Sequence, residues 1–547
     1  MRLAPRVREA LSAAAAYAAI TTWLFRPLVR HLGSVSVTIG DALGNMWALT
    51  WAGRHLLEPR VLYDAPIFYP TRGALILNEG LFAQALEAGP LLALGASPLV
   101  AYNVVFLLTF PLSALAAYAL ARDLSASRGG AFIAGLGYAF CAYRFHHLPH
   151  VHTLSYQWFP LVLLALRRTL GTGSARWAVA LGAFGVLQAW SSGYYAALLA
   201  PVCALALLAG WRSAPAPGRR AAVLALATAG LIAATPLLTY WWQARVQGFT
   251  RSREECVHWS AWWRSYLEPG ELATAPHLRA LHDRFASPAA LFPGTAVAVL
   301  AAVALVRRRR DRGVLGLALL AAAGLLLSLG PDIHVGSTVV TGPFELLRYL
   351  PGFGLLRTPS RMGVITVLAL DILAAFGYAE LARAGARARV VRAGILALAV
   401  WESATFDAAS RLGVVPPPPP VADWLRTAPR GPVLELPWED PADSPPYLYW
   451  SNVHAQPMVN GWASFEPQRP MELARIASCC WPRDYAVRTL RGAGVRYVVV
   501  HLDRLRAGMR ARIEGAGELP VGVVLEAAIG ADRVYSIAAA PVATSAR

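Results

Sequence analysis

Apolar stretches of a length suited to a membrane recur eleven times along the 547 residues of this chain. A helix of about 17–25 apolar residues spans the hydrocarbon core of a bilayer. The composition agrees, because 56% of the residues are hydrophobic and 15% charged, against about 45–50% and roughly 25% in soluble domains. We therefore predict a mostly α-helical, polytopic membrane protein with eleven transmembrane helices, and exclude an ordinary soluble enzyme. The stretches lie near 9–30, 99–121, 127–145, 153–168, 176–191, 193–211, 219–240, 289–306, 313–330, 361–382 and 389–406.

The arginines give the predicted orientation of these helices. Fifty residues are basic, all of them arginine, and the net charge is +18. Because basic residues concentrate in cytoplasmic loops, we place every arginine-rich connection inside a bacterial cytoplasmic membrane, with the N-terminus cytoplasmic and the C-terminus extracytoplasmic. Topology accounts for the charge, so we predict no nucleic-acid partner. The connections are Arg2/Arg6/Arg8, Arg122/Arg128, Arg167/Arg168/Arg176, Arg212/Arg219/Arg220, Arg307 to Arg310 with Arg312, and Arg383/Arg387/Arg389/Arg392.

Two apolar segments need a separate interpretation. Residues 81–97 carry Glu87 and Pro90, and a charge at the centre of a span costs about 2.5–3.5 kcal/mol. We interpret this segment as a helix lying in the outer interface. Residues 9–30 resemble a signal peptide, but the many spans behind them favour an uncleaved signal anchor.

The chain is predicted to divide into a membrane part and a soluble tail. Residues 1–412 form the membrane domain, with an outer loop at 31–98. Residues 413–424 contain the proline run 416–420, which forms a stiff linker. Residues 425–547 form a small extracytoplasmic α/β domain. Its expected strands are 433–436, 495–501, 521–525 and 534–537, and its expected helices are 470–478 and 503–515.

Asp41 is the first acid on the outer side. It precedes a helix predicted to end near Leu57, in which Trp47 and Trp51 are spaced as on an interfacial helix. The structural interpretation is an N-cap, whose carboxylate accepts a backbone N–H of that helix. The functional interpretation is a general base at the membrane surface. The two interpretations are compatible.

Acids and histidines of the outer loops are further candidates for substrate binding. Asp64 and Glu79 are either acceptors of loop hydrogen bonds or contacts to a polar substrate or a metal. Four histidines cluster in residues 145–152, where His147 and His150 suit hydrogen bonding to a sugar or phosphate. Metal binding by the alternating histidines is the open alternative. Because no acid lies nearby in sequence, we predict no cofactor, with a divalent metal as the alternative.

Three arginines lie in an outer loop, against the positive-inside trend. Arg348, Arg357 and Arg361 belong to the segment 346–361, which enters a predicted span. Guanidinium forks suit phosphate oxygens, which makes these residues candidates for phosphate binding. Snorkelling toward lipid head groups is the alternative.

The absence of several catalytic and metal-binding motifs excludes further classes of chemistry. The sequence has no GxxxxGK[ST], no GxSxG, no HExxH and no Cys/His zinc pattern. Cys479 and Cys480 are adjacent, a spacing at which pairing is rare, so we expect no disulfide between them.

The order of these pieces resembles a known family. A first span precedes an outer Gly-Asp, an Asn-x-Trp helix, an Ile-Phe-Tyr-Pro turn and the interfacial helix. A His-rich loop before Gln-Trp-Phe-Pro and a Pro-Gly-Phe-Gly…Arg-x-Pro-x-Arg loop follow, and the tail adds Leu-Glu-Leu-Pro at 434–437 and Val-Asn-Gly at 459–461. Together they resemble the GT-C-type multi-span membrane glycosyltransferases of bacteria over nearly the whole chain.

The resemblance implies a function. It implies a polyprenyl-phosphate sugar donor, an extracytoplasmic glycan, lipid or protein acceptor, and membrane lipids as the remaining partners. In such enzymes an acid of the first outer loop is the catalytic base, and here that position is Asp41. Arg357 and Arg361 would stabilise the leaving phosphate, and His147 and His150 would line the same cavity.

One departure from the family pattern leaves alternatives open. Many GT-C enzymes carry a second acid before the fourth span, where this chain has His150, His152 and Gln157. Asp64 or Glu79 would have to compensate. The first alternative is therefore a non-catalytic GT-C-like protein, or a transporter or flippase of lipid-linked glycans. A structural envelope protein whose tail binds a partner is the second.

Overall fold

The structure is a computed structural model that describes residues 5–350, 352–382, 386–515 and 517–539. Pro351 of the outer arginine loop, and Arg2 and Arg383 of the basic connections, lie outside the described residues. The chain forms two compact units. Unit 1 comprises residues 1–32, 103–242 and 248–412, and unit 2 comprises residues 33–102, 243–247 and 413–547. The expected linear boundaries at 412 and 425 stay a prediction.

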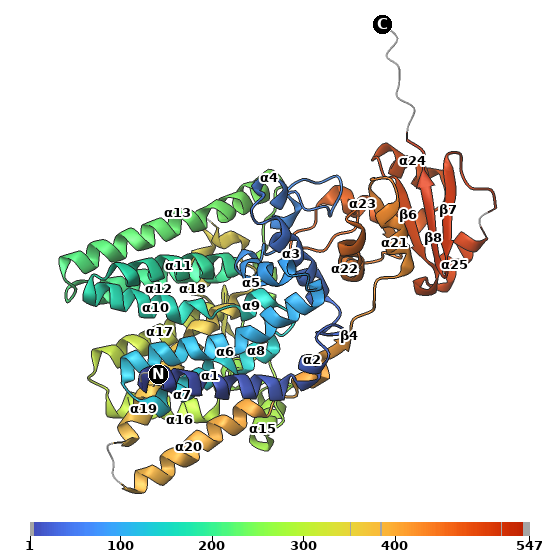
Figure 1. Ribbon diagram of the computed structural model, residues 1–547. Helices are drawn as coiled ribbons and strands as arrows, with labels where there is room; N and C mark the ends of the chain where they lie inside the picture. The colour runs from blue at the N-terminus through green and yellow to red at the C-terminus, as the bar shows by residue number, and fades with distance from the viewer. Residues whose placement is uncertain (1–4, 351, 383–385, 516, 540–547) are drawn as a thin grey trace. The chain divides into compact units, whose positions relative to one another are not determined.

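Long helices account for most of unit 1 (Figure 1). Each of the eleven apolar stretches overlaps a helix, as hydropathy predicts. These helices are α1 (Pro5–Leu24), α6 (Pro98–Ser125), α7 (Arg128–Ala139), α10 (Trp158–Thr172), α11 (Ala175–Ser191), α12 (Gly193–Trp211), α13 (Ala216–Val246), α16 (Thr295–Arg307), α17 (Arg312–Ser328), α19 (Gly363–Ala382) and α20 (Ala386–Ala404).

Length and apolarity support a membrane location for unit 1. Within the described residues, four segments are long and apolar enough to cross a bilayer: α6, α12, α13 and the segment 359–382 that contains α19. Helices α16 and α17 are apolar but shorter. The count of eleven spans stays a prediction.

Helix α19 forms the centre of unit 1. Its most apolar window is 89% buried, and it packs against α7, α16 and α17. Two glycines allow close crossings: a Cβ on Gly377 would overlap the Leu300 carbonyl, and one on Gly130 would lie 2.6 Å from the Ala375 carbonyl oxygen. In a bilayer the hydrophobic effect does not drive helices together, so they associate through close packing. Small residues permit this packing because they let the two backbones approach each other.

Helix α13, unlike α19, is mostly exposed. Only 22% of its most apolar window is buried, and Leu224, Leu231 and Leu238 are exposed. Their spacing of seven residues places them on one face of the helix. An apolar face of this kind matches lipid hydrocarbon, as expected of a transmembrane helix.

Shorter elements connect the long helices of unit 1. They are α2 (Arg26–Arg30), α8 (Ala142–His146), α9 (Val151–Leu154), α14 (Arg253–His258), η2 (Trp263–Leu267), α15 (Pro276–Phe285), β2 (Asp332–Val335), β3 (Thr338–Thr341), α18 (Pro343–Arg348), η3 (Phe353–Leu355), η4 (Pro359–Met362) and η5 (Ala408–Arg411). Strands β2 and β3 form an antiparallel hairpin in which Asp332 pairs with Thr341.

Unit 2 joins the first outer loop to the tail of the chain. The loop supplies β1 (Val35–Val37), α3 (Asp41–His55), α4 (Pro59–Leu62), η1 (Ala74–Leu77) and α5 (Phe82–Ala93). The tail supplies β4 (Leu412–Val414), α21 (Pro420–Thr427), β5 (Val433–Leu436), η6 (Pro441–Asp443), α22 (Ser444–His454), α23 (Gln468–Cys480), α24 (Asp484–Gly492), β6 (Tyr497–His501), η7 (Leu502–Arg504), α25 (Ala507–Glu514), β7 (Val523–Ile529) and β8 (Asp532–Ile537).

The tail contains a mixed sheet with the strand order β5-β6-β8-β7. Strands β5 and β6 are parallel and the other neighbours are antiparallel. All four expected strands are present, with β7 extending further than the sequence indicated. Helix α23 covers the expected helix 470–478, while α25 covers only the later part of the expected helix 503–515, whose first residues belong to η7. The extracytoplasmic position of this part stays a prediction.

The structure corrects two details of the tail. The predicted linker 413–424 is not extended throughout, because α21 begins at Pro420 and buries Val421 and Leu425. The fixed φ angle of proline already suits the first position of a helix. The expectation that Cys479 and Cys480 stay unpaired is also wrong, since they form a disulfide.

Candidate functional site

Arg361 is a buried cation without an anion. Arg361 is 8% exposed. Its guanidinium stacks over the ring of Tyr194, with Cζ 4.5 Å from the ring centroid. Within the described part of the chain, its Nε has no hydrogen-bond partner and no carboxylate pairs with it. An uncompensated buried charge costs several kcal/mol, so the arrangement favours an anionic ligand at this position.

Tyr194 fixes the segment that carries Arg361. Its hydroxyl oxygen accepts the backbone N–H groups of Arg357 at 3.0 Å and Thr358 at 3.2 Å. The next residue of α12, Tyr195, donates to the Thr153 carbonyl and contacts the Tyr143 hydroxyl at 3.0 Å. Two adjacent tyrosines of one helix therefore hold both the arginine segment and the histidine-rich loop.

His147 and His152 of the histidine-rich loop are neutral imidazoles. The ring of His150 lies 6.1 Å from that of His147 and 5.7 Å from that of His152, centroid to centroid. Burial lowers the pKa of His147 and of His152 well below the ordinary value, and the charge of Arg361 lowers both pKa values further. The Nδ1 atom of His152 is buried without a partner among the described residues. Neutral rings beside a cation can donate hydrogen bonds to an anion.

Arg348 and Arg357 differ from Arg361 because each has a carboxylate nearby. Arg348 donates to Glu345 Oε2 at 3.0 Å and to the Arg251 carbonyl at 3.0 Å. Arg357 lies 3.6 Å from Glu255 Oε1. A substrate-binding role for these two arginines stays a prediction.

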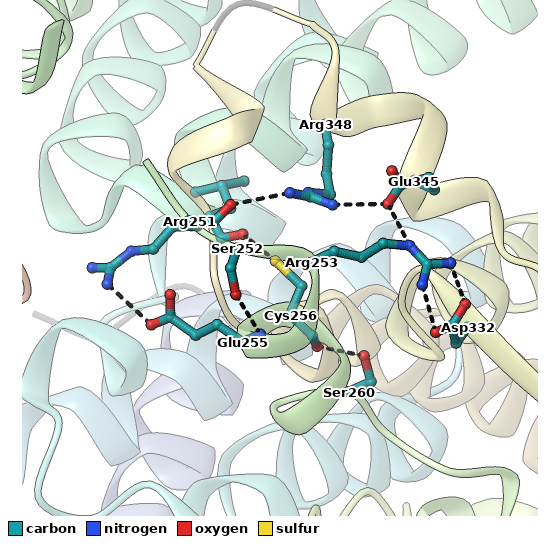
Figure 2. Close-up of polar contacts among 10 residues, drawn as sticks. Arg251, Ser252, Arg253, Glu255, Cys256, Ser260, Asp332, Glu345 and Arg348 are labelled. Carbon is teal, nitrogen blue, oxygen red and sulfur yellow. Dashed lines mark hydrogen bonds and ion pairs between the residues drawn. The ribbon is translucent and has the colours of Figure 1, made fainter. Parts of the chain in front are cut away.

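Figure 2 shows the polar frame that supports the arginine segment. Arg253 of α14 donates to both carboxylate oxygens of Asp332, at 2.9 Å to Oδ2, and lies 3.7 Å from Glu345 of α18. The thiol of Cys256 donates to the Leu356 carbonyl at 3.5 Å. Because these contacts join α14, the β2–β3 hairpin and α18, the residues just before Arg357 have a fixed anchorage.

Asp41 lies at the first position of α3 in unit 2. The N-cap residue is Gly40, and no side chain caps this helix. The expectation that Asp41 is the N-cap of α3 is therefore wrong. The N-cap is the preceding residue, Gly40, and Asp41 is the first residue of the helix. The helix ends at His55, two residues before the expected end. The role of Asp41 as a base stays a prediction.

Asp64 has a structural contact in the outer loop. Its Oδ1 accepts the backbone N–H of Gly73 at 2.7 Å, and Gly73 has a φ of +67°. The acid thus closes a turn at a residue that needs left-handed backbone. Glu79 is partly exposed in the same unit. Within the residues that the structure describes, no group of three or more His, Cys, Asp or Glu side chains is arranged so that it could hold a metal ion.

A second buried ionisable cluster lies in unit 2, and the sequence analysis did not anticipate it. His501 bonds to Asp532 Oδ1 through Nδ1 at 2.7 Å and to Glu435 Oε2 through Nε2 at 2.8 Å. Burial lowers the pKa of His501, but the two carboxylates outweigh it and raise the pKa to about 9. The three residues lie on neighbouring strands. Glu435 and His501 lie in short apolar runs that predict only core, and Asp532 lies just before the expected strand 534–537.

Comparison with solved structures identifies the fold. The arabinofuranosyltransferase AftD from Mycobacteria aligns with a TM-score of 0.57 and 17% identity, covering 99% of this chain and 40% of that one. The oligosaccharyltransferase of Archaeoglobus fulgidus aligns with a TM-score of 0.53 and 14% identity, covering 90% of this chain and 70% of that one. No protein-family model and no curated relative matches the sequence. This chain therefore has the fold of GT-C membrane glycosyltransferases and spans about two fifths of the length of the first neighbour.

Proposed function

We propose that this chain, which has the GT-C fold, transfers a sugar from a polyprenyl-phosphate donor to a hydroxyl group outside the cytoplasmic membrane of a bacterium. The observation that supports the proposal most is Arg361, a buried guanidinium with no anion among the described residues. A lipid-linked phosphate supplies the missing negative charge. The neighbouring neutral histidines supply hydrogen bonds rather than competing positive charge.

The proposed chemistry assigns a role to each candidate residue. Asp41 of unit 2 takes the proton of the acceptor hydroxyl as its oxygen attacks the anomeric carbon of the sugar. The bond between that carbon and the phosphate oxygen breaks, and the electron pair leaves with the polyprenyl phosphate. Arg361, with Arg357 and the histidines His147 and His150, stabilises the negative charge of the departing polyprenyl phosphate. A hydrogen-bond donor that acts in this way is worth about 100- to 1000-fold in turnover.

Two surface features support an outer location for the tail and the loops. The disulfide between Cys479 and Cys480 is of a kind that persists in oxidising compartments and is rare in the cytosol. Trp259, Trp262 and Trp263 are all exposed, and exposed tryptophans in a membrane protein collect at the level of the lipid head groups.

The test is donor turnover by the purified protein. Wild type, Asp41→Asn and Glu58→Gln are incubated in detergent with a panel of polyprenyl-phosphate sugars, and free polyprenyl phosphate is measured. We expect release by wild type and by Glu58→Gln, an exposed acid of the same loop, but not by Asp41→Asn. No release from any donor by well-folded wild type would refute the enzyme and favour a transporter or flippase of lipid-linked glycans.

A further inference from the structure

Trp462 lies over the first turns of α3 in unit 2. A Cβ added to Gly44 would lie 2.5 Å from Cε3 and 3.0 Å from Cδ2 of the Trp462 indole. Gly44 follows Asp41 by three residues, and helical residues three apart are neighbours on one face, about 5–6 Å between Cβ atoms. The tail of the chain therefore places an aromatic ring beside the acid to which the proposed function gives the role of base.

Hydrogen bonds on both sides of Trp462 hold it in this position. Before it, the Phe68 N–H donates to the Asn460 carbonyl at 3.3 Å. After it, the Phe465 N–H donates to the Leu77 carbonyl at 3.1 Å. The segment that carries Trp462 is thus clamped to the first outer loop at two points, and the indole has little freedom to leave α3.

Trp462 approaches the backbone of α3 closely and still keeps an accessible surface. Gly44 is an interior residue of α3, where glycine costs about 1 kcal/mol relative to alanine. The glycine leaves room for the indole to approach the helix backbone. Yet the indole is not fully buried: Trp462 keeps part of its surface exposed, whereas Trp47 of the same helix is 5% exposed. A ring that receives a ligand must keep an accessible surface, and Trp462 meets this condition.

We propose that Trp462 is the platform on which a sugar ring of the acceptor stacks, so that the acceptor is a glycan. The inference rests on the proposed function, because it takes Asp41 as the base. The face of an indole carries negative charge density and attracts the polarised C–H groups of a sugar ring. Stacking there orients a hydroxyl of the same ring toward Asp41. A lipid or protein hydroxyl has no ring to use this surface.

The experiment measures acceptor use and donor hydrolysis separately. The acceptors are n-octyl glycosides of glucose, mannose, galactose and arabinofuranose, with n-octanol and a serine-containing peptide as hydroxyls without a sugar ring. We expect transfer to at least one glycoside and none to octanol or the peptide. Trp462→Leu should raise the acceptor KM about tenfold or more, a change of about 1.4 kcal/mol, while acceptor-free donor hydrolysis stays unchanged. Trp462→Phe should recover part of the loss.

Glycine variants test the same ring without changing it. Gly44→Ala should raise the acceptor KM in the same direction, because the new Cβ occupies the place of the indole. Gly508→Ala is the matched control, since a Cβ there meets nothing within 4 Å, and Trp424→Phe controls for loss of a tryptophan in the same unit. Melting temperatures show which variants fold normally. An unchanged KM in Trp462→Leu, or octanol serving as well as the glycosides, would overturn the platform.

A binding measurement separates this inference from the proposed function. Saturation-transfer NMR with the matching methyl glycosides needs no turnover. If wild type turns over no donor but binds a glycoside in a Trp462-dependent manner, the enzyme is refuted and the sugar platform stands. If turnover occurs but binding and KM are independent of Trp462, the enzyme stands and the platform is refuted.

Discussion

Two buried ionisable clusters of this protein have opposite electrostatics. In unit 2, His501 lies between Glu435 and Asp532, and its pKa rises to about 9. In unit 1, burial and the nearby charge of Arg361 lower the pKa of His152 well below the ordinary value. The same side chain is thus charged in one cluster and neutral in the other. In the first cluster two carboxylates of the protein surround the imidazolium, so its cation is paired and its role is structural. In the second cluster the cation has no carboxylate partner among the described residues and favours an anionic ligand.

Glu435→Ala is expected to give the largest effect, on stability. The carboxylate is 2% exposed and bonds to His501, and removing one partner of a buried ion pair costs about 3–5 kcal/mol. Denaturant unfolding of wild type and variant measures the difference. Glu439→Ala is the control, since Glu439 pairs with Arg506 at an exposed site and should change stability by at most about 1 kcal/mol. Equal losses in both variants would contradict a structural cluster at Glu435.

Arg361→Gln is expected to affect turnover and not stability. Turnover of the lipid-linked donor should fall about 100- to 1000-fold, or about 3–4 kcal/mol. The melting temperature should not fall, because the guanidinium has no anionic partner to lose among the described residues. Arg264→Gln, at an exposed arginine of the same unit, should change neither. A variant with a lowered melting temperature but unchanged turnover would reverse the comparison and make Arg361 a structural residue.

The pH dependence of stability sharpens the comparison further. The folded pKa of His501, about 9, lies above the ordinary value of 6.5. Its stabilisation is therefore complete below about pH 6.5 and is lost as the pH rises through 9. A rise of this size corresponds to about 3 kcal/mol. Unfolding of wild type and His501→Gln should thus differ in slope between about pH 6 and about pH 10, with the variant flatter; parallel curves would contradict a charged His501.

The sequence predicted the elements better than the clusters. Hydropathy is local, so every apolar stretch could be assigned a helix, and the strands of the tail followed from their short apolar runs. Arg361 was also accessible from sequence, because an arginine in a loop predicted to lie outside departs from the charge pattern of the other loops. The absence of an anionic partner for Arg361 was not accessible from sequence, because it depends on which residues surround the side chain after folding.

The remaining differences have local and long-range causes. Asp41 was expected as the N-cap of α3, but a glycine without a side chain takes that position. Glu435, His501 and Asp532 come from three strands separated by 66 and 31 residues, a proximity that no local pattern encodes. Trp462 likewise meets Gly44 across more than half of the chain. Sites assembled from distant segments are therefore the ones that sequence patterns miss.

The disulfide between Cys479 and Cys480 should give the smallest effect. A bond between adjacent residues closes a minimal loop, so the chain-entropy model assigns it about 1 kcal/mol, which corresponds to roughly 2–4 °C in melting temperature. The melting of wild type with and without a phosphine reductant, and of the Cys479→Ser, Cys480→Ser double variant, measures this shift. The disulfide lies at the end of α23, where Ser478 donates to the Trp438 carbonyl and Arg512 donates to the Ser478 carbonyl at 2.7 Å. A much larger shift would therefore mean that the covalent bond, and not only the Glu435–His501–Asp532 cluster, holds the α/β part of unit 2 together.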